Sequence, residues 1–234
     1  MNTSKKSRAT VSFYGRRKGP PLRGRKQRLM AEALPRLRLD LTRTPDQNLH
    51  DLFKNPGDRT QLEIGFGGGE HLTHQAQTHP TVNFIGVEPF INGMAKMLGA
   101  IEDFSLENVR LYDDDASQLL DWLPDESLDR IDLLYPDPWP KKRHWKRRFV
   151  NQANLDRFFR VLKPEGEFRF ASDIDTYINW TLCHVEKQGE FAWTAEKSSD
   201  WNDAWQGWIR TRYEAKAIRE ERQPCYLIFK KPGR

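Results

Sequence analysis

The chain has 234 residues, of which 37% are hydrophobic and 30% are charged, and its formal net charge is +5 with a sequence pI near 9.2. This length suits one domain with a sizeable core, and no apolar run approaches the roughly 18–20 residues that span a bilayer. The N-terminus lacks the apolar segment of a secretory signal and two cysteines form no disulfide framework, so the composition excludes membrane-spanning and disulfide-stapled classes and favours the cytoplasm.

Charge is distributed unevenly along the chain. Residues 1–38 contain twelve Lys or Arg against one acidic residue, Glu32, a net +11 that leaves −6 on the remaining residues. A basic segment on an acidic body attracts polyanions such as nucleic acids, although a solvated and disordered tail explains the first residues as well. We expect a basic, partly flexible N-terminal arm over residues 1–38 and one folded domain over residues 39–234.

Strand and helix patterns alternate after this arm. Residues 27–38 open with a short helix that ends before Pro35, because proline disfavours the helical conformation of the residue before it. Apolar runs predict strands at residues 61–64, 82–87, 109–112, 130–134, 167–170 and 225–229. Helical patterns lie at residues 70–77, 91–102, 116–121, 151–162 and 176–187. This alternation predicts an α/β fold with a doubly wound, mostly parallel sheet, which binds ligands beyond the carboxyl ends of its strands.

The first strand runs into a glycine loop, LEIGFGGGE, that carries Glu63, Gly65, Gly67 and Gly69. Glycines allow positive φ and let the backbone approach a ligand closely. A dinucleotide fingerprint requires its third glycine where this chain has Glu70. An acid before the first glycine opposes a pyrophosphate but suits the ammonium group of S-adenosylmethionine. The loop therefore favours a nucleoside cofactor without phosphates.

Acidic residues also follow the second and third strands. Glu88 ends the second strand in GVEPF, where a carboxylate can accept both ribose hydroxyls of an adenosine. Asp115 and Ala116 follow the third strand in DDDA, where an adenine amino group needs an acceptor. Each feature has an ordinary alternative, an exposed acid for Glu88 and a helix cap for Asp115. Together with the glycine loop, they predict a nucleoside-binding site.

The fourth strand leads into YPDPWPKKRHWKRR, in which Asp137 stands between two prolines. Proline fixes φ, so the carboxylate is presented with little conformational freedom beside the transferable group of the cofactor. Residues 141–148 add six Lys or Arg, a cluster suited to phosphates. An amino-methyltransferase tetrad, Asn/Asp/Ser-Pro-Pro-aromatic, is the alternative, but here the acid lies between the prolines.

These motifs resemble those of the TrmB family of bacterial tRNA (guanine-N7-)-methyltransferases over nearly the whole chain from residue 10. The stretches that carry the resemblance are TVSFYGRR, LEIGFGGGE, GVEPF, DDDA, YPDPWPKKRHWKRR, ASDIDTY and TRYEAKA. The resemblance implies a Rossmann-like methyltransferase fold over residues 39–234. It also implies methyl transfer from S-adenosylmethionine, leaving S-adenosylhomocysteine, to N7 of guanine 46 in the variable loop of tRNA.

The family also implies roles for individual residues, with no metal and no membrane contact. Expected cofactor contacts are Glu63, Gly65, Gly67, Gly69, Glu88, Asp115, Ala116 and Asp137, and Asp137 is also the expected catalytic residue. Expected substrate contacts are Lys141, Asp173, Thr211, Arg212, Tyr213 and Glu214. Expected RNA contacts are Arg143, His144, Trp145, Lys146, Arg147 and Arg148. We expect a cytoplasmic monomer or homodimer.

The chemistry accounts for a fixed acid beside a basic cluster. Guanine N7 carries a free lone pair and no proton, so the enzyme has to align the base and stabilise the charge that develops on it. We hypothesise that Asp137 accepts hydrogen bonds from the guanine, with Asp173 or Glu214 as a second acceptor. An RNA-binding protein with a vestigial cofactor site is the alternative outside enzymes.

Three tryptophans near the C-terminus recur at helical spacing. Trp201, Trp205 and Trp208 stand at i, i+4 and i+7, which predicts one helix face. Packing in the core is the favoured interpretation, and stacking on RNA bases is the alternative.

Overall fold

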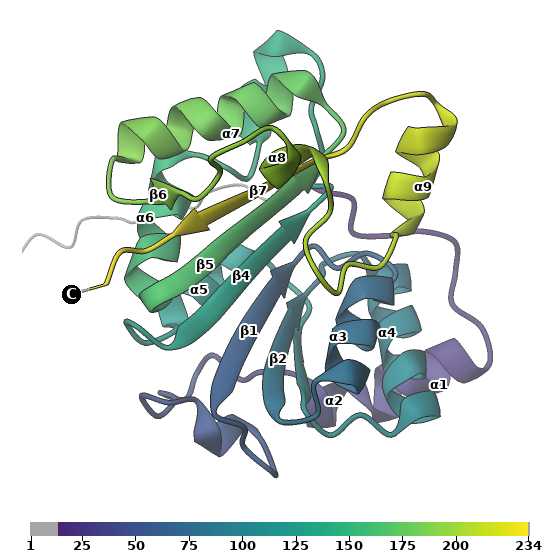
Figure 1. The fold of residues 1–234 in the computed structure, drawn as a ribbon. Coiled ribbons are helices and arrows are strands. Elements are labelled where there is room, and N and C mark those ends of the chain that lie inside the picture. Colours follow the sequence, from purple (N-terminus) through teal and green to yellow (C-terminus); the bar gives the residue numbers. More distant parts are fainter. Residues whose placement is uncertain (1–13, 234) are drawn as a thin grey trace, which may run out of the picture.

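The computed structural model describes residues 14–233, so the first thirteen residues of the predicted arm lie outside the described residues. A seven-stranded sheet in the order β3-β2-β1-β4-β5-β7-β6 forms its centre (Figure 1). The strands are β1 (Arg59–Ile64), β2 (Val82–Val87), β3 (Val109–Tyr112), β4 (Leu128–Leu134), β5 (Leu162–Ser172), β6 (Ala192–Trp193) and β7 (Cys225–Lys230).

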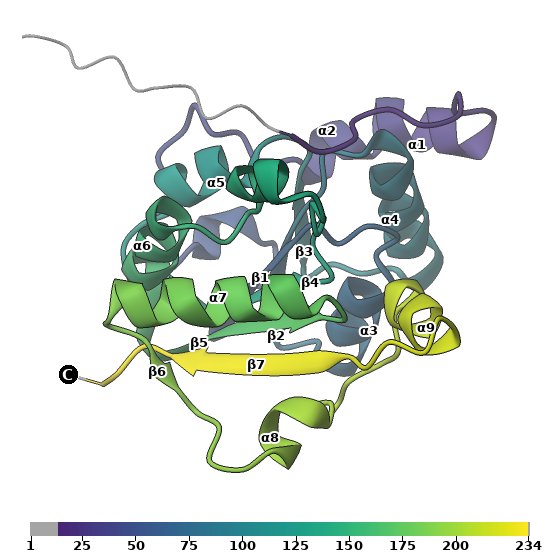
Figure 2. The ribbon, with the colours of Figure 1, turned by 90° about the horizontal axis from the view of Figure 1, so that it is seen from above.

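Helices cover both faces of this sheet (Figure 2). The larger helices are α1 (Arg25–Glu32), α3 (Glu70–Thr78), α4 (Ile91–Phe104), α5 (Ala116–Trp122), α6 (Gln152–Val161), α7 (Asp175–Gln188) and α9 (Arg212–Arg219). Short elements are α2 (Leu34–Leu37), α8 (Ser199–Asn202) and the 3₁₀ helices η1 (His50–Leu52) and η2 (Lys142–Arg147). Within residues 14–233, no helix is long and apolar enough to cross a membrane.

The sheet topology confirms the predicted fold. Strands β1 to β5 pair in parallel, and β7 and β6 add two antiparallel strands at one edge. The chain runs from β1 outward through β2 to β3 and then returns to β4 on the other side of β1. Such a reversal leaves a crevice at the carboxyl ends of the central strands.

Two separate apolar clusters hold the helices to the sheet. The larger one lies beneath α5, α6 and α7, where Phe158 of α6 packs 4.8 Å from Phe168 of β5 between ring centroids. Leu155, Phe158 and Val161 of α6 are buried because they recur at helical spacing on one face. The smaller cluster lies between the four helices α1, α2, α3 and α4 and the strands β2 and β3.

The end of the predicted arm packs on this second cluster. Leu29 of α1 and Leu34 of α2 are buried, and the Arg25 guanidinium pairs with the carboxylates of Glu102 and Asp103 on α4. The expected helix ends at Glu32, and α2 then begins with a proline in its first turn, a position that needs no amide donor. Packing against the folded domain therefore begins before residue 38, within the predicted arm.

The tryptophan segment differs from the prediction in one respect. Helix α8 ends at Asn202, and Trp205 and Trp208 lie in a loop in which Gly207 has a φ of 78°. The expectation of one helix face was therefore wrong, because the chain becomes extended at Asp203, directly after the helix. Core packing is confirmed, since both rings lie against Tyr226 and the buried end of β4.

Candidate active site

A cavity of about 380 Å³ lies at the carboxyl ends of β1, β2 and β4, beside the loop that follows β3. Six of the eight expected cofactor residues line it, namely Gly65, Gly67, Glu88, Asp115, Ala116 and Asp137. These residues come from four loops that are far apart in the sequence, and the parallel sheet brings them to one edge. The cavity therefore joins the glycine loop to the acidic turn after β4.

The glycine loop adopts a conformation that requires glycine. Gly65 and Gly67 have φ values of 73° and 58°, in the left-handed region that residues with a Cβ rarely adopt. Helix α4 approaches the loop so closely that a Cβ at Gly93 would lie 2.2 Å from the carbonyl oxygen of Gly67. The backbone of the loop is thus fixed from behind by α4.

Glu88 is bound to this loop through both carboxylate oxygens. One oxygen accepts a hydrogen bond from the Gly67 amide at 2.7 Å, and the other accepts one from the Phe90 amide at 2.9 Å. Burial raises the pKa of the Glu88 carboxyl, and the two amide donors oppose that shift. A carboxylate oxygen has two acceptor directions, so Glu88 can still accept from a ligand in the cavity.

Asp115 caps a helix and also lines the cavity. Its carboxylate accepts a hydrogen bond from the Ser117 amide at 2.9 Å and so caps α5. The residue is buried and also lines the cavity. The cap therefore fixes the direction of a carboxylate that a ligand can reach.

The turn after β4 has an unusual backbone. Tyr135 and Trp139, on either side of the Pro136-Asp137-Pro138 sequence, have φ values of 48° and 45°, which are uncommon outside glycine. Asp137 is exposed at the edge of the cavity, and the protein around its carboxyl group desolvates it enough to raise its pKa. Strained turns of this kind occur at functional sites, where surrounding structure stabilises them.

Two expected cofactor residues lie outside the lining of the cavity. Gly69 supports the loop from behind, since a Cβ there would meet the sulfur of Met97 at 2.6 Å. Glu63 is buried, and its carboxylate bonds to Nδ1 of His71 at 2.8 Å. Burial, the largest single effect, lowers the pKa of His71, but the charge and hydrogen bond of Glu63 together with the charge of Asp132 give a net upward shift.

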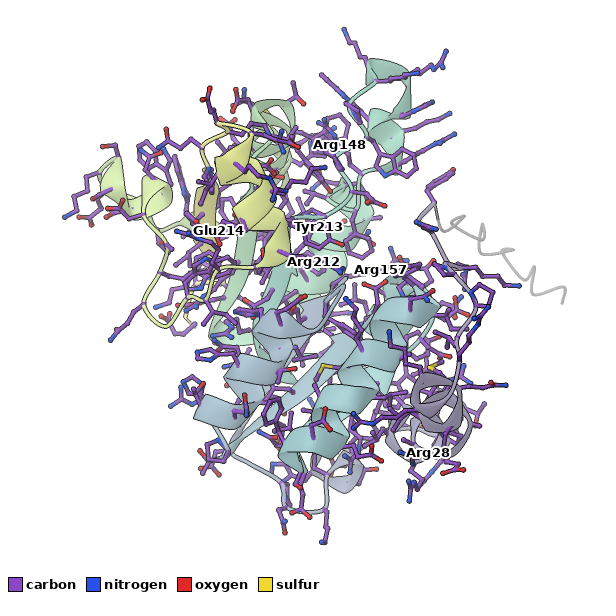
Figure 3. All side chains as sticks on the ribbon, turned by 90° about the vertical axis from the view of Figure 1, so that its right-hand side faces the viewer. Arg28, Arg148, Arg157, Arg212, Tyr213 and Glu214 are labelled. Atoms are coloured by element: carbon purple, nitrogen blue, oxygen red, sulfur yellow. The ribbon has the colours of Figure 1, made fainter. Side chains whose placement is uncertain are left out.

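The four residues of the TRYE stretch divide into two pairs. Arg212 and Tyr213 are exposed, and Tyr213 lines the cavity next to the glycine loop (Figure 3). Thr211 and Glu214 are buried, and Thr211 caps α9 by accepting from the Glu214 amide at 3.2 Å. The exposed pair can reach a substrate, whereas the buried pair holds α9 in place.

Both acids expected as second acceptors accept hydrogen bonds from other side chains. The Glu214 carboxylate accepts from the indole of Trp208 and the hydroxyl of Tyr226, both at 2.6 Å. The Asp173 carboxylate accepts from the Arg222 guanidinium at 2.5 Å. Neither acid lines the cavity, and the hypothesis that one of them assists Asp137 stays a prediction. Both acids instead stabilise the region around α9 and β7.

The basic segment faces two ways. Lys141, Lys142, Arg143 and Lys146 are exposed. Desolvation, together with the positive charges of this segment, lowers the pKa of His144. Trp145 is half-buried, and its indole donates to the carbonyl oxygen of Pro140. Arg148 is only 1% exposed, so its expected RNA contact is wrong for this structure. A guanidinium enclosed by protein cannot reach a phosphate.

Several cavity residues did not emerge from the sequence. Tyr14 and Arg16 line the cavity from the N-terminal side, and the Arg147 guanidinium lies over the rings of Tyr14 and Trp139 at 5.1 and 4.9 Å. Asn154 of α6 contributes from the opposite side. Tyr14 lies in TVSFYGRR, one of the stretches that resemble the TrmB family, so the resemblance could have indicated it. Asn154 lies in an ordinary helical pattern that gives no such indication.

Known proteins provide an independent comparison. Residues 58–227 match the family model described as "Putative methyltransferase". The chain is 58% identical over 231 residues to the tRNA (guanine-N(7)-)-methyltransferase of Rhizobium meliloti (strain 1021), covering 99% of this chain and 100% of that protein. It is 59% identical over 222 residues to the protein of the same name from Brucella melitensis biotype 1, covering 95% of each. The crystal structure of the 16S rRNA methyltransferase KamB has the same fold, with a TM-score of 0.54 and 12% identity over 81% of this chain and 95% of that one.

The close approach of α4 to the glycine loop can be tested with Gly93→Ala. The added methyl group would overlap the Gly67 carbonyl, so we expect the free energy of unfolding to fall by about 1–3 kcal/mol in urea denaturation. Gly99→Ala is the matched control on the same helix, because its Cβ would meet only a Leu29 methyl group at 3.9 Å. That control should be neutral or stabilising by up to about 1 kcal/mol. Equal effects of both substitutions would contradict the close approach.

The His71–Glu63 pair predicts a pH-dependent contribution to stability. The pKa of His71 is raised above its ordinary value of 6.5, so the contribution is complete below about pH 6.5 and is lost as pH rises through the folded-state pKa. His71→Asn should therefore reduce the free energy of unfolding more at pH 6 than at pH 9. Urea denaturation of the wild type and the variant at the two pH values measures this difference. An effect that does not change with pH would show that His71 does not form a charged pair with Glu63.

Proposed function

The chain belongs to the tRNA (guanine-N(7)-)-methyltransferases, and from this premise we propose that it methylates N7 of guanine 46 in the variable loop of tRNA. S-adenosylmethionine is the methyl donor of this reaction. The observation that carries the proposal is the cavity in which Asp137 shares one space with Glu88, Asp115 and the glycine loop. We propose a cytoplasmic location, and a monomer or homodimer stays a prediction.

The residues of the cavity fit the methyl donor. Glu88 retains acceptor capacity for the ribose hydroxyls, and Asp115 offers an acceptor for the adenine amino group. Glu88, Asp115 and Asp137 together give the cavity three carboxylates that can accept hydrogen bonds from the hydroxyl and amino groups of the donor. The donor supplies an electrophilic methyl group on a sulfonium. Glu63 lies behind the loop, so its part in binding is to fix the loop or to act after the His71 bond rearranges.

Asp137 serves to align the guanine. The ring's N1–H and exocyclic amino group are donors, so the carboxylate can hold the base with N7 directed at the methyl group. N7 carries no proton, so Asp137 does not need to remove one. As the methyl group is transferred the base becomes cationic, and a fixed carboxylate nearby stabilises that charge. Its raised pKa means that this role requires a pH above that pKa.

The exposed basic side chains of residues 141–146, here called the outer cations, serve to bind the RNA. Lys141, Lys142, Arg143 and Lys146 are exposed next to the turn that carries Asp137, and exposed cations gain affinity for phosphates through counterion release. Arg212 and Tyr213 lie on the other side of the cavity edge. The target base has to leave its stack to reach the cavity, at a cost of a few kcal/mol. Phosphate contacts on this side can offset that cost.

Replacement of Asp137 tests its role. We expect Asp137→Ala to lower kcat by roughly 10²–10³, since a fixed group that stabilises developing charge typically contributes that much. Asp137→Asn, which keeps shape and one acceptor, should lose less. Asp58→Ala, an exposed acid that precedes β1 at the other end of the sheet, is the control. Methyl transfer to tRNA lacking the modification is measured, followed by nucleoside analysis. Near wild-type kcat in both Asp137 variants would rule out the role, and methyl on an amino group would rule out the N7 product.

Charge reversal tests the RNA-binding side chains. The double variant Lys142→Glu, Arg143→Glu should weaken tRNA binding and reduce the slope of log Kd against log salt by roughly 0.7–0.9 for each phosphate that the variant no longer binds. Lys187→Glu, an exposed residue in the last turn of α7, is the matched control for charge alone. Fluorescence titration with unmodified tRNA at several salt concentrations gives both values. An unchanged slope in the double variant would show that these residues do not contact phosphates.

A further inference from the structure

We propose that Arg148 is a positioning residue for methyl transfer, which holds the turn from Tyr135 to Trp139, and with it Asp137, against α7. The proposal rests on the role of Asp137 proposed above. It assigns to the last arginine of the basic segment a task different from RNA binding. Figure 3 shows Arg148 beside the upper projection of the ribbon, with Arg212 and Tyr213 below it at the same end of the molecule and Arg28 at the other end.

Three directed hydrogen bonds carry this assignment. Nε of Arg148 donates to the carbonyl oxygen of Pro138 at 3.0 Å, so one edge of the guanidinium binds the turn itself. Nη1 donates to the carbonyl oxygen of Thr176 at 2.6 Å, and Nη2 donates to its hydroxyl at 2.9 Å. Thr176 lies in the first turn of α7. One planar side chain therefore joins the residue after Asp137 to a helix of the folded body.

Aromatic rings enclose the same guanidinium. Its central carbon lies 4.5 Å from the ring centroid of Trp145, 4.7 Å from that of Tyr177 and 5.5 Å from that of Trp180. Burial lowers the pKa of Arg148, so its charge is held at an electrostatic cost. The rings and the three acceptors offset this cost. A buried cation bound this specifically fixes geometry, because few other positions of the side chain would satisfy it.

The turn needs such external support. Tyr135 and Trp139 adopt left-handed conformations, which are unfavourable for residues other than glycine. Such conformations persist only where the surrounding structure stabilises them. Pro138 is the residue between Asp137 and Trp139, so a bond to its carbonyl acts within one residue of the carboxylate. At the other side of the turn, the Arg147 guanidinium lies over the Trp139 ring. The two inner arginines thus hold the turn, while the outer cations face solvent.

The test uses Arg148→Lys, which retains the charge but not the planar set of donors. An ammonium group cannot bind Pro138 and both Thr176 oxygens in the arginine's geometry. We expect kcat at saturating tRNA and S-adenosylmethionine to fall at least tenfold. We expect the Kd for tRNA to stay within twofold and its salt slope to stay unchanged, because the variant still binds the same phosphates.

Arg160→Lys is the matched control. Arg160 on α6 also donates to main-chain carbonyls, those of Leu120 and Leu123, but it lies beside the amino end of β5, away from the cavity. We expect Arg160→Lys to lower the melting temperature, because the variant loses hydrogen bonds within the fold. We expect it to leave kcat unchanged. If Arg148→Lys does not fold, Thr176→Val removes only the hydroxyl acceptor and should still lower kcat by about two- to threefold.

The outcomes separate the possibilities. A fall in kcat for Arg148→Lys or Thr176→Val, with tRNA affinity intact and Arg160→Lys fully active, supports the proposal. Wild-type kcat in the position 148 and 176 variants, or an equal loss in Arg160→Lys, overturns it. Weaker tRNA binding with a smaller salt slope in Arg148→Lys also overturns it, because Arg148 would then contact phosphate. If Asp137→Ala retains full activity, the proposed function of Asp137 fails whatever Arg148 does.

Discussion

Two non-glycine residues in left-handed conformations, Tyr135 and Trp139, flank the Pro136-Asp137-Pro138 turn, which places the carboxylate of Asp137 at the cavity. Each such residue costs on the order of 1–3 kcal/mol, so the rest of the protein has to determine the turn. On one side, the Tyr135 amide extends the sheet ladder by donating to Ala171 at 2.8 Å. On the other side, Arg148 binds Pro138. The position of Asp137 is therefore a property of β4, β5 and α7 together.

Acidic and basic side chains meet at the same end of the sheet. Glu88 and Asp115 lie buried in the cavity, and Asp137 stands at its edge. Lys146, Arg147 and Arg148 also line the cavity, and Lys141, Lys142 and Arg143 are exposed beyond its lining. A cationic methyl donor and a polyanionic RNA have opposite electrostatic requirements, and this arrangement meets both within one site. Because the strand order reverses between β1 and β4, loops from both halves of the sheet reach the cavity.

Sequence reasoning succeeded where the determinants are local and failed where they are distant. The bounds predicted for the second and third strands match β2 and β3, because short apolar runs between helices have few alternative structures. Most of the glycines and acids expected at strand ends line one cavity because the parallel topology brings these ends to one edge, although Glu63 and Gly69 lie outside its lining. The bonds of Glu214 to Trp208 and Tyr226, by contrast, depend on a loop whose path the tryptophan spacing did not reveal. Helical spacing alone cannot show that Gly207 turns the chain.

Arg148 shows that the sequence of a charge cluster does not reveal which of its side chains are buried. Within KKRHWKRR every cation looks alike, and the length of a basic run does not show which side chains will be solvated. The partners that bury Arg148, Thr176 and Tyr177, lie more than twenty residues away on α7. The 3₁₀ helix η2 ends at Arg147 and Arg148 follows it directly, so the exposed cations and the buried arginine lie on one short segment of the chain. In the role proposed for Arg148, its bond to Pro138 connects this segment to the turn that carries Asp137.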